Sequence, residues 1–149
     1  MKILFAGGGT LGPVTPLLAV AEALRAMDSS VQIVWVGTSH GPERSVVEAA
    51  GYPFFELPVA RIPRYASLEW ITFPWQILKA FAGAWNILRR ERPDAIGTAG
   101  GFTGVPVVIV GCVLGIPSWI HQPDVRPVLS NVVAAPFAIL GSIGVVAQL

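Results

Sequence analysis

Short apolar runs alternate with helix-length amphipathic runs along the chain, and this alternation constrains the fold more than any other feature. Strands joined by helices are typical of βαβ units, in which the strands run parallel. The apolar runs suit a sheet that helices cover on both faces. We therefore predict an α/β fold with a doubly wound parallel sheet, whose strands are Lys2–Ala6, Val31–Gly37, Pro53–Leu57, Asp94–Ala99, Ser118–His121 and Ile143–Ala147.

Helix signals fill the intervals between these strands. Thr15 is the expected N-cap of the first helix, with Pro16 as its first helical residue. Gly51 stands where the second helix should end in a left-handed residue, and Pro93 stops the third. The expected helices are one that follows Thr15, then Pro42–Gly51, Phe73–Arg90, Gly104–Gly115 and one after Pro127.

Composition excludes two classes of protein. Only 13% of the 149 residues are charged and 53% are hydrophobic, with a net charge of +1. An average soluble domain carries about 25% charged residues, so the chain is neither a disordered tail nor a conventional basic nucleic-acid binder. The single cysteine, Cys112, excludes an internal disulfide and is expected to be inert core. We expect one compact cytoplasmic domain, because no signal-peptide apolar region opens the sequence.

Two long stretches, residues 95–123 and 127–149, contain no charged residue. Uncharged stretches longer than about 18 residues can span a bilayer. Glycines and prolines break the first into strand, loop, helix and strand. The second fits a buried helix followed by a strand better than a membrane-inserted tail, although the sequence leaves both open.

A glycine-rich turn follows the first predicted strand and leads into the first helix, from Gly7 to Pro13. Such a turn presents backbone N–H groups and a helix N-terminus, which favour a phosphate or diphosphate. The pattern matches neither the dinucleotide-binding fingerprint nor a Walker A loop. From the spacing alone, the interpretation as an anion site is only somewhat better supported than the interpretation as a purely structural turn.

A second glycine-rich turn, from Ala99 to Pro106, follows the fourth predicted strand. Two such turns at carboxyl ends of parallel strands should face one crevice, where open α/β sheets bind ligands. The next strand ends in the polar segment 121–127, where His121 is a candidate general base, Asp124 a sugar-hydroxyl acceptor and Arg126 a phosphate ligand. From the motif alone, a structural role is the better explanation of that segment: a histidine with satisfied hydrogen bonds at a strand end, followed by residues 124–127 that cap the next helix.

Residues 61–92 carry a charge of +4, while the rest of the chain carries −3. Six of the 14 aromatic residues also lie there. Tryptophan rings beside cations suit contact with an anionic membrane surface, although burial under a further domain would give a similar pattern. The basic cluster is too small to favour single-stranded nucleic acid. The predicted membrane contacts are Arg61, Arg64, Trp70, Trp75, Lys79, Phe81 and Trp85.

Four segments, in this order, resemble motifs of glycosyltransferase family 28, the MurG-like N-acetylglucosaminyltransferases. They are Gly8–Pro16, similar to G-G-T-G-G-H-x-x-P; Trp35–Thr38 with Pro42-Glu43, similar to the second strand and turn; Gly100–Pro106, similar to G-G-Y-x-S-x-P; and Gly115–Pro117 with 121–124, similar to G-I-P followed by H-E-Q-N. The resemblance spans nearly the whole chain. It implies the Rossmann-like N-terminal, acceptor-binding half of a GT-B glycosyltransferase.

The resemblance also implies an activity. Family members transfer N-acetylglucosamine from UDP-N-acetylglucosamine to undecaprenyl-diphosphate-linked N-acetylmuramoyl-pentapeptide in peptidoglycan synthesis, with inversion and without a metal or other cofactor. It implies a peripheral protein on the cytoplasmic face of the cell membrane, and no nucleic-acid partner. By this resemblance the acceptor and donor contacts are Gly8, Gly9, Thr10, Leu11, Gly12, Gly100, Gly101, Phe102, Thr103, Asp124 and Arg126, and His121 or Asp124 is the base.

The chain departs from the family pattern at several positions. Pro13 replaces the loop histidine and has neither a titratable group nor a backbone N–H. Leu11 replaces a loop glycine, and Gln122 and Asp124 stand where glutamate and asparagine are usual. The donor-binding half is absent from residues 1–149, so we expect either a fragment or one subunit of a split transferase, whose donor-binding half a partner chain supplies.

Two alternatives from other classes stay open. One is a non-catalytic subunit that binds a lipid diphosphate, which Pro13 favours. The other is a nucleotide-binding Rossmann module, but no acidic residue near the end of the second predicted strand offers a ribose contact.

Overall fold

The computed structural model describes residues 1–39, 41–58, 69–122 and 128–143. These residues form a six-stranded sheet in the order β3-β2-β1-β4-β5-β6, and every neighbouring pair is parallel. The predicted doubly wound parallel sheet is thus confirmed. The strands are β1 (Lys2–Ala6), β2 (Gln32–Gly37), β3 (Phe54–Glu56), β4 (Ala95–Thr98), β5 (Ser118–Gln122) and β6 (Leu140–Ile143).

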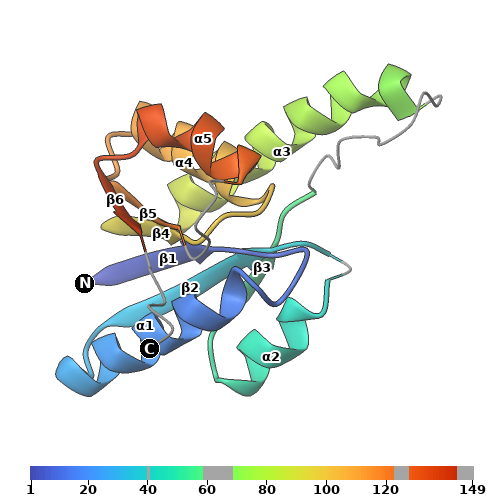
Figure 1. The fold of residues 1–149 in the computed structure, drawn as a ribbon. Helices are drawn as coiled ribbons and strands as arrows, with labels where there is room; N and C mark the ends of the chain where they lie inside the picture. Colours follow the sequence, from blue (N-terminus) through green and yellow to red (C-terminus); the bar gives the residue numbers. More distant parts are fainter. Residues whose placement is uncertain (40, 59–68, 123–127, 144–149) are drawn as a thin grey trace, which may run out of the picture.

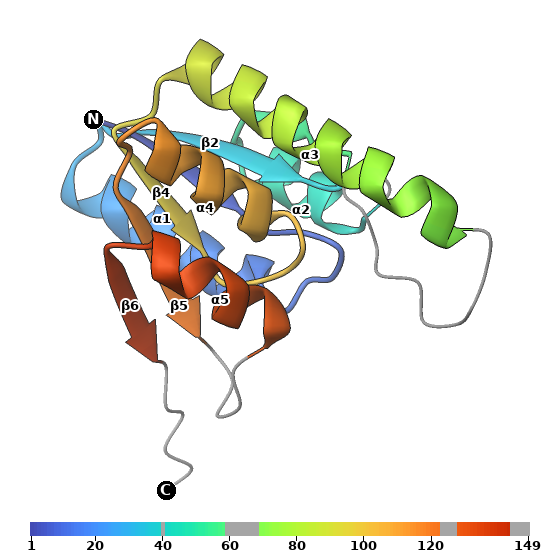
Figure 2. The same ribbon diagram turned by 90° about the horizontal axis from the view of Figure 1, so that it is seen from above.

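Helices cover both faces of the sheet (Figure 1). Helices α1 (Val14–Met27) and α2 (Glu43–Ala49) pack on one face. Helices α3 (Glu69–Glu91), α4 (Gly104–Val113) and α5 (Leu129–Ala134), the last followed by the 3₁₀ turn η1 (Ala135–Phe137), pack on the other. Figure 2 shows α3, α4 and α5 side by side over that second face.

The two faces have separate cores, because successive side chains of a strand point to opposite sides. In β1, Ile3 and Phe5 are buried among residues of α1 and α2, together with Trp35 of β2. Leu4 and Ala6 are buried on the other side, among residues of α3, α4 and α5. Both faces of the central strands are therefore buried from solvent, as the apolar runs of the sequence predict.

Helix ends show where local prediction holds and where it fails. Gly51 and Gly115 have φ of +79° and +72°, and each ends a helix as expected. The prediction that Thr15 caps α1 is wrong, because the helix begins at Val14 with Pro13 as N-cap. The Thr15 hydroxyl donates to the Leu11 carbonyl oxygen at 3.0 Å instead of accepting from the helix backbone.

Two further boundaries differ from the predictions. Helix α3 begins four residues earlier than expected and contains Pro74 in its second turn. The last strand occupies Leu140–Ile143 rather than 143–147, and residues 144–147 lie outside the described part. Its pairing with β5 begins earlier because the N–H of Ile139 already donates to the Ser118 carbonyl.

Cys112 is exposed on α4, so its expected place in the core is wrong. None of the helices that the structure describes is both long and apolar enough to cross a membrane.

Candidate functional site

The two glycine turns meet between β1 and β4, where the strand order of the sheet reverses. The chain leaves β1 toward β2 on one side and leaves β4 toward β5 on the other, and open α/β sheets bind ligands at such a switch point. We call residues 7–13 loop 1 and residues 99–103 loop 2. A Cβ atom at Gly101 would lie 2.9 Å from the Gly8 carbonyl oxygen, so the loops are in contact. The expectation that both loops share one edge is confirmed.

Loop 2 is held by side chains from β4 and α5. The N–H of Gly100 donates to Thr98 Oγ1 at 3.2 Å, and the N–H of Gly101 donates to Ser130 Oγ at 3.2 Å. Both glycines have positive φ, +103° and +88°, which explains why glycine is required at each. Thr103 caps α4 and is fully buried, and its hydroxyl oxygen has no hydrogen-bond partner among the described residues.

Loop 1 is held by β2 and α2. The Trp35 indole N–H donates to the Gly7 carbonyl at 3.0 Å, and the N–H of Gly9 donates to Glu43 Oε1 at 3.0 Å. Gly9 has a φ of +89°. The loop then passes directly into α1, where the Leu11 carbonyl accepts from the first helical N–H groups.

Glu43 is a fully buried carboxylate at the start of α2. Besides the Gly9 N–H, its Oε1 accepts from the Thr38 N–H at 2.8 Å and the Thr38 hydroxyl at 2.5 Å. Burial by itself raises the pKa of the Glu43 carboxyl, but the hydrogen bonds from Thr38 and Gly9 outweigh it and hold this pKa below its ordinary value. The carboxyl is therefore ionised at neutral pH.

Four loop amides have no hydrogen-bond acceptor in the part of the chain that the structure describes. Among the described residues, no acceptor lies within hydrogen-bonding distance of the backbone N–H groups of Thr10, Leu11, Gly12 and Phe102. All four residues are exposed, and they precede the N-termini of α1 and α4. Backbone N–H groups at helix N-termini favour an anion, so this edge of the sheet can hold a phosphate or diphosphate.

His121 lies near the carboxyl end of β5, at the same edge of the sheet. Its ring stacks on Trp119 with centroids 5.7 Å apart. The following residue, Gln122, is buried on the opposite face, where Asn131 Nδ2 donates to Gln122 Oε1 at 2.6 Å. Asp124 and Arg126 lie outside the described residues.

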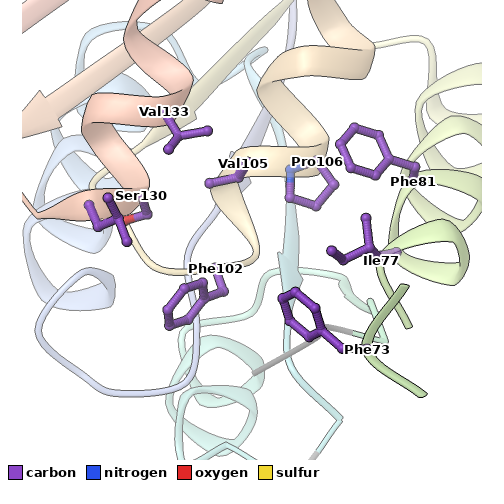
Figure 3. A pocket seen from close by; sticks show the side chains of 10 residues that line it. Phe73, Ile77, Phe81, Phe102, Val105, Pro106, Ser130 and Val133 are labelled. Atoms are coloured by element: carbon purple, nitrogen blue, oxygen red, sulfur yellow. The ribbon is translucent and has the colours of Figure 1, made fainter. Parts of the chain in front are cut away.

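An apolar groove of about 240 Å³ opens beside loop 2, between α3, α4 and α5 (Figure 3). Ser130 belongs to both features, because it lines the groove and accepts from the Gly101 N–H. Phe102 and Phe73 lie at one end of the groove (Figure 3). The lining residues are Phe73, Ile77, Ala80, Phe81, Phe102, Val105, Pro106, Leu129, Ser130 and Val133.

The side of α3 that points away from the sheet carries aromatic rings beside cations, and we call it the outer face of α3. Trp75, Leu78 and Trp85 are 60%, 57% and 37% exposed. Lys79 Nζ lies 5.8 Å from the Trp75 ring centre, and the Arg89 guanidinium lies 5.8 Å from that of Trp85. Of the other predicted membrane contacts, Phe81 lines the groove, Trp70 belongs to the first turn of α3, and Arg61 and Arg64 lie outside the described residues.

The sequence analysis did not single out Glu43, Ser130 or Asn131 as parts of the site. Glu43 offered a weak signal, since it is an acidic residue in a helix first turn directly after a strand and a turn. Ser130 and Asn131 come from a helix that follows the site in the chain, and no local pattern marks them. Among the described residues, no three His, Cys, Asp or Glu side chains gather closely enough to hold a metal ion.

A parallel sheet with touching glycine loops at its switch point defines a Rossmann-like domain of the kind that forms half of a GT-B glycosyltransferase. Within that class, the chain belongs to glycosyltransferase family 28, because the model of the "Glycosyltransferase family 28 N-terminal domain" matches residues 3–139.

Relatives named UDP-N-acetylglucosamine--N-acetylmuramyl-(pentapeptide) pyrophosphoryl-undecaprenol N-acetylglucosamine transferase are similar to this chain. Those from Clostridium botulinum (strain Alaska E43 / Type E3) and Carboxydothermus hydrogenoformans are 35% and 38% identical over 136 and 135 residues. Each match covers 91% of this chain, but the chain spans only 37% and 36% of those relatives.

Solved structures agree on the fold. The crystal structure of Acinetobacter baumannii MurG matches with a TM-score of 0.81 and 25% identity, over 95% of this chain and 41% of that one. A UDP-GlcNAc 2-epimerase from Neisseria meningitidis bound to UDP-GlcNAc matches with a TM-score of 0.65 and 15% identity, over 93% of this chain and 39% of that one. The latter likeness shows the fold alone.

Proposed function

We propose that this chain is the acceptor-binding half of a transferase that moves N-acetylglucosamine from UDP-N-acetylglucosamine to undecaprenyl-diphosphate-linked N-acetylmuramoyl-pentapeptide. The observation that carries the proposal is the junction of free loop amides with an apolar groove, through Phe102 and Ser130. A polyprenyl diphosphate needs that combination, an anion site next to an apolar one. The names and 35–38% identity of the relatives support the same acceptor.

The diphosphate would lie against the outward N–H groups of Thr10, Leu11, Gly12 and Phe102. Charge-assisted hydrogen bonds from backbone N–H groups to phosphate oxygens are short and strong. The N-termini of α1 and α4 add favourable dipole charge at the same place. Gly9 and Gly101 would contribute through conformation, since their N–H groups already donate to Glu43 and Ser130.

The apolar groove would receive the first part of the polyprenyl chain. Its volume of about 240 Å³ is below the roughly 300–1,000 Å³ of a pocket for a whole drug-sized ligand, so it fits a short segment of a long lipid. None of the described residues that line it is charged. The outer face of α3 would rest on the cytoplasmic face of the membrane, with Trp75 and Trp85 at headgroup level.

In the transfer step the muramyl hydroxyl oxygen bonds to C1 of N-acetylglucosamine while the bond from C1 to the UDP oxygen breaks. A base must take the hydroxyl proton, and Pro13 offers no titratable group in loop 1. We assign this role to His121 or Asp124, both predicted for the same edge of the sheet. A donor-binding half would hold UDP-N-acetylglucosamine across the crevice.

Binding by this chain alone tests the acceptor site. Farnesyl diphosphate should bind more tightly than inorganic pyrophosphate by isothermal titration calorimetry, because only the former fills the groove. Val133→Trp should block the groove and remove that difference while pyrophosphate still binds. Val132→Trp is the matched control, since Val132 is a similarly exposed neighbour on α5 that does not line the groove. Equal binding of the two probes by the unmodified chain would contradict the proposal.

A non-catalytic lipid-diphosphate binding subunit is the second candidate, and Pro13 is the observation that favours it. Transfer of N-acetylglucosamine to a lipid-linked acceptor, measured with a donor-half partner, separates the two. An enzyme half should lose turnover in His121→Ala or Asp124→Ala while keeping farnesyl diphosphate binding. A subunit without catalytic function should give no turnover with any partner, yet bind the lipid diphosphate equally in both variants.

A further inference from the structure

The Glu43 side chain joins three separate segments of the chain at one oxygen atom. It reaches from the first turn of α2 into the space between loop 1 and the end of β2. Three donors converge on Oε1: the N–H of Gly9 at 3.0 Å, the N–H of Thr38 at 2.8 Å and the hydroxyl of Thr38 at 2.5 Å. Loop 1 is thereby tied to β2 and α2 through a single carboxylate.

Two glycines make room for this carboxylate. A Cβ atom at Gly8 would lie 2.4 Å from Glu43 Oε1, and one at Gly41 would lie 1.7 Å from Oε2. Real Cβ atoms do not approach other atoms closer than 3.0 Å, so a side chain at Gly8 or Gly41 would displace the carboxylate. The fold around loop 1 is built to hold a carboxylate at this place.

Burying a carboxylate costs more free energy than burying an apolar side chain, so packing alone does not explain Glu43. Glu43 is fully buried, and its Oε2 has no hydrogen-bond partner among the described residues. An unpaired buried polar atom costs free energy that an apolar side chain of similar size would not. What the carboxylate provides, and an apolar side chain cannot, is an acceptor for the Gly9 N–H.

That acceptor determines how loop 1 presents its amides. The N–H of Gly9 donates to Glu43, and Gly9 has a φ of +89°. The next three residues, Thr10, Leu11 and Gly12, are exposed, and their N–H groups have no acceptor among the described residues. We infer that Glu43 is a positioning residue of the anion site, which fixes loop 1 in the conformation that presents these three amides to a diphosphate. The inference rests on the proposed function for the identity of the ligand.

The test uses the ¹⁵N-labelled full chain with Glu43→Gln, and with Glu48→Gln as the matched control, because Glu48 is an exposed residue of the same helix. Hydrogen exchange of the Gly9 amide should be at least about tenfold faster in Glu43→Gln, and farnesyl diphosphate should bind about tenfold more weakly, as expected when a hydrogen bond to a charged group is weakened. Glu48→Gln should change neither quantity.

Thr38 variants provide a second test if Glu43→Gln does not fold. Thr38→Val removes the hydroxyl donor and should weaken farnesyl diphosphate binding, whereas Thr38→Ser keeps the hydroxyl and should restore it. If the Thr38 side chain served only for packing, Thr38→Val should bind farnesyl diphosphate at least as well as Thr38→Ser, because valine has nearly the shape of threonine.

The outcomes separate this inference from the proposed function. A folded Glu43→Gln chain with unchanged Gly9 exchange and unchanged binding overturns the role of Glu43, even if the lipid diphosphate binds. If the unmodified chain binds neither farnesyl diphosphate nor pyrophosphate, the proposed function fails. Exchange of the Gly9 amide then still decides the inference: faster exchange in Glu43→Gln supports it, and unchanged exchange overturns it.

Discussion

Gly101 is the residue at which the two loops touch, and it combines a φ of +88° with a Cβ position 2.9 Å from the Gly8 carbonyl oxygen. Gly101→Ala therefore adds backbone strain and forces the loops apart. We expect a loss of about 1–3 kcal/mol in the free energy of unfolding, measured by urea titration, together with weaker farnesyl diphosphate binding.

Gly115→Ala is the control for Gly101→Ala. Gly115 has a similar φ of +72°, but nothing lies within 4 Å of its Cβ position. It lies beyond the opposite end of α4, so binding should be unchanged and only the strain, about 1 kcal/mol, should appear. If the two variants lose the same stability and both bind normally, contact between the loops is not needed for the site.

The ionisation of Glu43 gives stability a defined pH dependence. Its folded-state pKa is lowered, so the carboxylate stabilises the fold above the ordinary glutamate pKa, and this contribution is lost as pH falls through the folded pKa. The difference in unfolding free energy between the unmodified chain and Glu43→Gln should thus be largest near neutral pH and shrink in acid. The nearest cation in sequence, Arg44, is paired with Glu48 and Glu56. A difference that grows in acid would contradict the assignment.

Sequence alone identified the glycines of the site but not the groups that hold them. Glycine marks positions such as Gly100 and Gly101, because positive φ is a local property. The tethers, Glu43 and Ser130, depend on which strands and helices become neighbours, and α5 contributes Ser130 from 29 residues further along the chain. His121 was placed at the same edge as the glycine loops because the carboxyl ends of parallel strands lie at one edge of a sheet.

At the scale of elements, the two faces of α3 differ in residue size, with small or aliphatic residues on the buried face and tryptophans on the outer face. Ala80, Ala84 and Leu88 recur every fourth residue and are buried, so the helix lies close to the sheet and to α4. Trp75 and Trp85 project on the outer face instead. The small buried residues and the exposed aromatic rings thus lie on different faces of α3.

Substitution of both tryptophans tests whether the outer face of α3 contacts a membrane surface. Trp75→Ser with Trp85→Ser should reduce binding to vesicles that contain anionic phospholipid by several-fold in a sedimentation assay, since indole rings anchor proteins at the interface. Thermal stability should change little, because both side chains are exposed. Met27→Ser is the control: Met27 is 85% exposed on α1, on the opposite side of the sheet, and its loss should leave vesicle binding unchanged.

Element boundaries were predictable where a breaker residue marks them and not elsewhere. Gly51 and Gly115 ended their helices as expected. The start of α3 and the last strand were misplaced, since Pro74 is tolerated within the helix and the uncharged C-terminal run offers no contrast between buried and exposed positions. Tertiary pairing with β5 fixes the last strand, and that pairing is not encoded locally.

At the scale of the molecule, the proposed site joins parts that are far apart in the sequence. Loop 1 belongs to the half of the sheet that α1 and α2 cover, while loop 2 and the apolar groove belong to the helices of the other face. A polyprenyl diphosphate would contact both parts at once. Since it would bind only the folded chain, it should stabilise the whole domain rather than one loop.

Thermal unfolding with ligand tests this linkage. Farnesyl diphosphate at about 100 times its Kd should add about 2.7 kcal/mol to the free energy of unfolding, which for a domain of this size raises Tm by roughly 5–10 °C. Farnesol lacks the anion and pyrophosphate lacks the chain, so at the same concentration each should give a smaller shift. Val133→Trp should reduce the farnesyl diphosphate shift to that of pyrophosphate, because the groove is then filled by the indole ring. Equal shifts with farnesol and farnesyl diphosphate would mean that the loop amides bind no anion and that the groove acts alone.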